Sequence, residues 1–70
     1  MTLCGGYPTL RRVIVNTKTA QSFRGVLWRK RGSFLVLKDT ELLAQNGSRT
    51  TVDGEVVIER SNVDFIQVLP

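Results

Sequence analysis

Short runs of β-branched and aliphatic residues recur along the chain, and each run ends at glycine, asparagine or other turn-forming residues. Runs of this kind are typical of β-strands, and no window has the three-to-four-residue apolar spacing of an amphipathic helix. The pattern therefore predicts an all-β fold. Five strands are predicted, over residues 11–17, 22–29, 34–43, 55–59 and 63–69.

The polar and glycine-containing segments between these runs predict the turns. They lie at residues 17–20, 30–33, 44–50, 53–54 and 61–62. In the second of these turns Gly32 is the natural position for a positive φ angle. Gly25 falls inside a predicted strand, where a glycine indicates a bend or a close approach of two backbones.

The length of 70 residues predicts a single domain over residues 1–70, with an irregular N-terminal lead-in at residues 1–9. A core of this size is marginal, and small domains usually gain stability from disulfides, a bound metal or self-association. Cys4 is the one cysteine and the chain has no histidine, so an intrachain disulfide is impossible and histidine-based metal sites are excluded. We therefore expect no cofactor and no metal, and self-association becomes the leading source of added stability.

The same residue counts argue against catalysis and against a membrane segment. Without histidine there is no Ser/His/Asp or Cys/His arrangement, the six carboxylates lack metal-binding spacing, and no phosphate-binding glycine motif occurs. We predict no catalytic residues and no enzyme activity. The longest apolar runs have four residues, such as Phe34 to Leu37, so we expect neither a membrane span nor a signal peptide.

Charge is distributed unevenly along the chain, whose formal net charge is +4. Residues 1–38 carry eight basic residues and no acidic one, and residues 39–70 carry two basic residues and six acidic ones. Such a division permits attraction between copies of the chain, or a basic surface for an anionic partner. It is also common in small domains that have no such partner.

Two stretches of the chain resemble the two motifs of the Sm/LSm-like family. The segment Phe23-Arg24-Gly25-Val26-Leu27 resembles the Arg-Gly-x-Leu step into a long bent strand, and Leu35 to Asp39 resembles the strand that returns. The segment Ile58-Glu59-Arg60-Ser61-Asn62-Val63, followed by Asp64-Phe65-Ile66, resembles the second motif. Together the two motifs cover nearly the whole chain, from about Leu10 to Leu69.

The resemblance implies a small, five-stranded, strongly bent barrel that forms a homo-oligomeric ring of five to seven copies. The fourth predicted strand of one copy would pair with the fifth of the next, which would satisfy the backbone groups at two open sheet edges. Some apolar residues of these strands must instead fill the core, because successive side chains face opposite sides. The predicted interface comprises Val56, Val57, Ile58, Val63, Phe65 and Ile66.

The chain departs from the RNA-binding members of that family at their nucleotide pocket. The segment from Arg29 to Phe34 lacks the Asp and the Met-Asn step of those members. Glu59 stands where they have an arginine and Arg60 where they have a glycine, so only Asn62 matches. A carboxylate repels phosphate, and a missing asparagine removes hydrogen bonds to a base. Pro8 also implies that the family's N-terminal helix is short or absent.

Three functions are compatible with these residues. The first is a structural ring that docks on a larger protein assembly, most specifically a minor capsid, decoration or connector protein of a phage virion; otherwise we expect a cytoplasmic protein. The alternative is a ring that binds RNA or another nucleic acid, and the third is a small barrel that acts through a protein partner. Candidate contacts to nucleic acid or to an acidic partner are Trp28, Arg29, Lys30, Arg31, Arg60 and Asn62, because an aromatic ring among cations suits stacking and phosphate contact.

Overall fold

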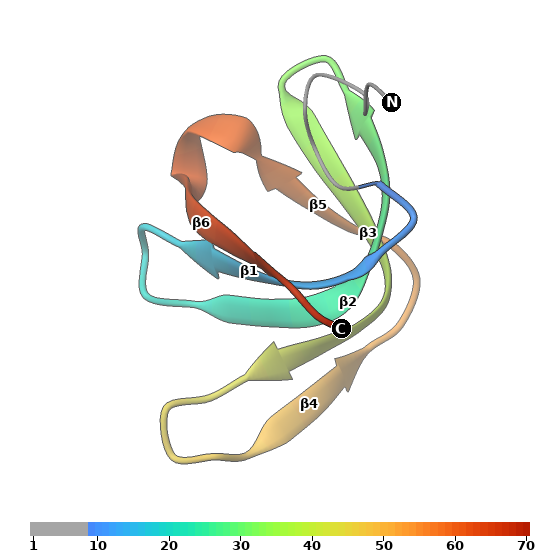
Figure 1. Ribbon diagram of the computed structural model, residues 1–70. Helices are drawn as coiled ribbons and strands as arrows, with labels where there is room; N and C mark the ends of the chain where they lie inside the picture. Colours follow the sequence, from blue (N-terminus) through green and yellow to red (C-terminus); the bar gives the residue numbers. More distant parts are fainter. Residues whose placement is uncertain (1–8) are drawn as a thin grey trace.

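A computed structural model describes residues 9–70, which form one antiparallel sheet with no α-helix (Figure 1). Thr9 is the one residue of the predicted lead-in that is described, and Cys4 and Pro8 lie outside the described residues. Within the described range, no helix is long and apolar enough to cross a bilayer. The elements are β1 (Arg12–Thr17), β2 (Ser22–Arg31), β3 (Phe34–Leu43), β4 (Arg49–Val52), β5 (Val56–Glu59), the 3-10 helix η2 (Arg60–Asn62) and β6 (Val63–Val68).

The strands are ordered β4-β3-β2-β1-β6, and β5 also pairs with β3. β5 pairs with the first half of β3 and β4 with the second half, so β4 and β5 share one position in the sheet. The structure thus has strands at all five predicted positions and adds a sixth, β4, which the sequence did not predict. Beyond the barrel, β4 and the end of β3 form a two-stranded arm (Figure 1).

A sharp bend in β2 and β3 lets this small sheet curl around a core. Between Arg24 and Val26 the pairing register shifts, because β3 has one more residue than β2 at this point, and Asp39 there has a φ angle of +50°. A side-chain Cβ at Gly25 would lie 2.8 Å from the backbone oxygen of Lys38 and 2.8 Å from Thr40 Oγ1. The bend therefore requires a glycine, as a bulge in a tightly curved sheet commonly does.

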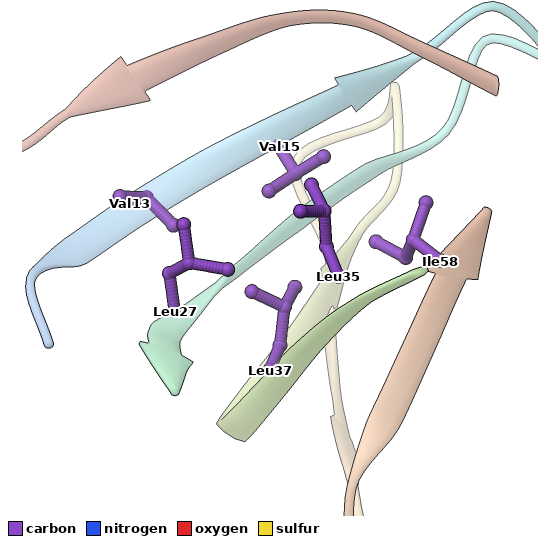
Figure 2. Close-up of a cluster of buried hydrophobic side chains, with 6 residues drawn as sticks. All are labelled: Val13, Val15, Leu27, Leu35, Leu37 and Ile58. Atoms are coloured by element: carbon purple, nitrogen blue, oxygen red, sulfur yellow. The ribbon is translucent and has the colours of Figure 1, made fainter. Parts of the chain in front are cut away.

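The core consists of aliphatic side chains that alternate along the strands toward the inside of the curve (Figure 2). Phe23, Val56, Val63 and Ile66 pack against it from the rim. Burial of such side chains is the main favourable term in folding, and here it is confined to a handful of residues. The buried cluster comprises Val13, Val15, Leu27, Leu35, Leu37 and Ile58.

Two predicted turns are shorter than the sequence indicated. The turn predicted over residues 44–50 is wrong at its end, because Arg49 and Thr50 already pair with β3 as the start of β4. The hairpin predicted at residues 30–33 is also shorter, since β2 continues to Arg31. In both cases cross-strand pairing with β3 extends the strand beyond the predicted boundary, and the β-branched side chain of Thr50 itself favours strand geometry.

Gly25→Ala tests whether close backbone approach sets the bend. We expect the free energy of unfolding to fall by about 1–3 kcal/mol, because the new methyl group overlaps a backbone oxygen that cannot move away alone. Urea denaturation measures the loss. Gln67→Ala, at an exposed position of β6, is the control and should change stability by less than about 0.5 kcal/mol. Equal stability of both variants would contradict this account of the bend.

Thr40 offers a second test, because its side chain is fully buried and Oγ1 has no hydrogen-bond partner. Thr40→Val keeps the shape and removes the unpaired hydroxyl, so we expect a gain of about 1 kcal/mol in the free energy of unfolding. The matched control is Thr17→Val, since the buried Thr17 Oγ1 donates to the Gln21 carbonyl at 3.0 Å and accepts from the Gln21 N–H at 3.1 Å. Thr17→Val should therefore destabilise the protein, and the opposite order of the two variants would refute the assignment.

Candidate subunit edges and nucleic-acid surface

The two strands next to the 3-10 turn each have an unpaired edge. β5 pairs only with β3 and β6 only with β1, and within residues 9–70 no ladder joins β5 to β6. A row of backbone N–H and C=O groups is therefore open on each strand. Open edges of this kind readily accept a strand from another chain.

Side chains on these two strands divide between the core and the outside. Of the six residues predicted to form an interface, Ile58 belongs to the core at 5% exposure, and Val56, Val63 and Ile66 pack against the core from its rim. Val57 and Phe65 face outward and are 57% and 52% exposed. The structure thus places an exposed apolar side chain beside each open edge.

A shallow hollow of about 420 Å³ lies on the outer face beside β5. Val36 and Val57 are register partners, and together with Phe34 they supply its apolar surface. Arg31 and Glu55 add the charged groups of its lining. Apolar surface is therefore concentrated next to the same edge.

The 3-10 turn η2, between β5 and β6, is hydrogen-bonded to two hairpin turns that are far apart in sequence. The backbone N–H of Arg60 donates to the Ser33 carbonyl at 2.7 Å, in the β2–β3 turn. The N–H of Lys18, in the β1–β2 turn, donates to the Asn62 carbonyl at 2.7 Å, and Asn62 Nδ2 donates to Thr19 Oγ1 at 3.3 Å. We call these three segments, residues 17–21, 31–34 and 59–62, the turn cluster.

Each of the three segments of the turn cluster carries an exposed cation. Lys18, Arg31 and Arg60 are exposed, and Lys30 lies just before Arg31 on β2. Glu59 is the one acid in the cluster, and its Oε1 accepts a hydrogen bond from Ser61 Oγ at 2.8 Å. Lys18 and Thr19 were missed by sequence reasoning, because no local signal shows that the β1–β2 turn contacts Asn62.

Trp28 has a different environment from the one predicted. It is the extra residue at a register shift of β2 and is 37% exposed. Lys38 Nζ lies 3.9 Å from the centre of its ring and 3.7 Å from Glu55 Oε2. One face of the ring is therefore already covered by a cation. That Trp28, Arg29, Lys30 and Arg31 together contact nucleic acid or an acidic partner stays a prediction.

The described residues contain no group of three or more acidic, cysteine or histidine side chains able to hold a metal ion. What they can do is bind: the open edges can pair with a strand, the hollow beside β5 can make apolar contacts, and the basic turns can attract anions.

No family model matches the chain, and no curated protein matches it either. Solved structures do match. A heptameric archaeal Sm protein, described for its implications for the eukaryotic snRNP core, is 27% identical with a TM-score of 0.76, over 87% of this chain and 88% of that one. The SmAP1 heptamer of P. aerophilum gives the same identity and TM-score, over 87% of this chain and 81% of that one.

The chain therefore has an Sm-like fold, and the family resemblance found in its sequence is confirmed. β5, η2 and β6 correspond to the second of the two motifs by sequence.

Proposed function

We propose that this protein is a non-enzymatic Sm-like module that assembles with itself into a ring and binds single-stranded RNA at the turn cluster. One observation supports the RNA-binding part above all. Backbone hydrogen bonds from Arg60 to Ser33 and from Lys18 to Asn62 bring three cation-bearing turns to one place. Repeated around a ring, these turns would present a continuous band of positive charge to a phosphate backbone.

Ring assembly is supported by the two open edges and their outward apolar side chains. Pairing β5 of one copy with β6 of the next would satisfy the exposed backbone groups of both strands. It would also shield Val57 and Phe65, which are more than half exposed in the single chain. The two similar structures are both heptamers, and we expect five to seven copies here.

The turn cluster supports contacts to phosphate more strongly than base recognition of the kind seen in RNA-binding members of the family. Glu59 remains a repulsive group at the position where those members have an arginine, and Ser61 holds its carboxylate in place. Asn62 is engaged through its carbonyl and its side chain in contacts to the β1–β2 turn. We therefore expect affinity that depends strongly on salt and little on sequence at this site.

A narrower role as a phage capsid, decoration or connector protein stays a prediction from sequence. Neither of the two similar structures is a phage protein, and both favour the RNA-binding function over the capsid role. Detection of this chain in purified virions by mass spectrometry would favour the capsid role.

Val57→Asp tests the ring. Because Val57 is exposed on β5, we expect the variant to remain folded while light scattering at micromolar concentration reports a single chain of 7.9 kDa instead of several. Thr50→Asp, at an exposed position of the other edge strand β4, is the control and should leave the assembled mass unchanged. Ile58→Asp is unsuitable, because a charge in the core should unfold the chain. A wild-type mass of one chain at every concentration would rule out the ring.

The double variant Lys30→Glu with Arg31→Glu tests RNA binding at the turn cluster. We expect its affinity for a uridine RNA of about 15 nucleotides to fall at least tenfold, and the slope of log K against log salt to fall by about two. Fluorescence anisotropy at several salt concentrations measures both. Arg11→Glu with Arg49→Glu makes the same change in net charge away from the turn cluster and should have a much smaller effect. Equal losses of RNA affinity in both double variants would show that the RNA is attracted by net charge alone, and would contradict binding at the turn cluster.

A further inference from the structure

β2 lies in the middle of the sheet, and its outer face, opposite the core, carries arginine side chains. Val13 of β1 points into the core, so its neighbours Arg12 and Ile14 face outward. They are the register partners of Val26 and Arg24 on β2, and directly opposed residues share a face. Arg12 and Arg24 therefore lie on the outer face, one on each of two adjacent strands.

A bulge adds two more side chains to the outer face further along β2. Arg29 is opposite Val36, which lies between two core leucines of β3 and so faces outward. Trp28 is the extra residue of the bulge, and its ring lies beside Lys38 Nζ. Lys38 is opposite the outward Val26. Because bulges re-aim side chains, an aromatic ring and a cation here follow one another on the same face.

The outward cations of β2, the ring of Trp28 and the neighbouring Arg12 form one surface, which we call the β2 stripe. Alternate residues of a strand are roughly 6.6 Å apart, a spacing that an extended chain of phosphates can follow. The stripe ends at Arg31, which also belongs to the turn cluster. The members of the stripe are Arg12, Arg24, Trp28, Arg29 and Arg31.

Neighbouring acids do not neutralise the stripe. Glu41 is opposite Arg24 but pairs with Arg49, and Oε1 of the acid lies 3.9 Å from Nη1 of the arginine. Glu55 pairs with Lys38 at 3.7 Å. Among residues 9–70, none of the four stripe arginines forms an ion pair. Unpaired guanidinium groups beside an exposed aromatic ring suit single-stranded nucleic acid, because they contact phosphate while the ring stacks on a base.

The stripe stays accessible in the proposed ring. β2 is separated from the open edge of β6 by β1 and from the open edge of β5 by β3. Strand pairing at those two edges therefore leaves the outer face of β2 uncovered. Trp28 is 37% exposed, and three of the four arginines are exposed while Arg24 is partly buried.

We propose that the β2 stripe is a second contact surface for single-stranded RNA, which leaves the turn cluster at Arg31, stacks a base on Trp28 and continues along the other stripe arginines. This inference rests on the proposed RNA binding and adds a path for the RNA out of the turn cluster. The contacts are to phosphates and to the flat face of a base, so the stripe binds RNA without regard to sequence.

Fluorescence of Trp28 tests the proposal, because Trp28 is the one tryptophan of the chain. A uridine RNA of about 15 nucleotides should quench its emission, through stacking of a base, over the same concentrations at which fluorescence anisotropy shows binding. The double variant Arg12→Gln with Arg24→Gln should bind this RNA several-fold more weakly. Its slope of log K against log salt should fall by about 1.4, which is about 0.7 for each lost phosphate contact.

Arg11→Gln is the matched control for Arg12→Gln, since both remove one positive charge from neighbouring positions. The Arg11 carbonyl accepts a hydrogen bond from the N–H of the core residue Leu27, which places Arg11 on the opposite face from the stripe. We expect Arg12→Gln to weaken RNA binding more than Arg11→Gln does. Should the variant with the partly buried Arg24 replaced fail to fold, this comparison of two exposed positions still tests the stripe.

The possible outcomes separate the stripe from the turn cluster. RNA binding by anisotropy without quenching of Trp28 would overturn the stripe proposal and leave RNA binding at the turn cluster intact. Equal losses of affinity in Arg11→Gln and Arg12→Gln would show attraction by net charge alone and would also overturn the stripe. Absence of RNA binding by the wild-type protein at low salt would overturn the proposed function itself.

Discussion

The close approach of β2 and β3 at Gly25 is the constraint on which the rest of this structure depends. A side chain there would collide with the backbone of Lys38, and the adjoining register shift at Asp39 turns both strands sharply. Only a sheet bent this strongly can surround a core of six aliphatic side chains in so short a chain. A flatter sheet of the same sequence would leave those side chains exposed on one face.

Bending the sheet also creates its two open edges. β5 pairs with β3 and β6 pairs with β1, and these two strands end beside each other without pairing, joined by the short turn η2. The same geometry brings η2 against the turns on both sides of it. Self-association and anion binding are therefore linked proposals, because the turn that separates the edges also gathers the cations.

Surface chemistry differs between the two faces next to these edges. The hollow beside β5 combines three apolar side chains with two charged ones, a mixture that suits contact with another protein surface. The hollow lined by β1, β6 and the end of β3 is instead rich in carboxamide side chains. Trp28, the one tryptophan of the sequence, lines neither hollow. It stands at a bulge of β2, where Lys38 covers one face of its ring.

The sequence by itself determined the all-β class, the positions of most strands and the bend at Gly25, because alternating apolar runs and an isolated glycine act locally. Even the family resemblance followed from short segments such as Phe23 to Leu27. The sequence did not reveal β4, because this strand of four residues lies between two turn signals and is defined by its pairing with β3. It also could not show that Lys18 and Thr19 meet Asn62, or that Phe65 stands opposite Asn16. These contacts join residues more than 40 positions apart, and only the tertiary structure decides them, because strand register and curvature depend on the whole core packing at once.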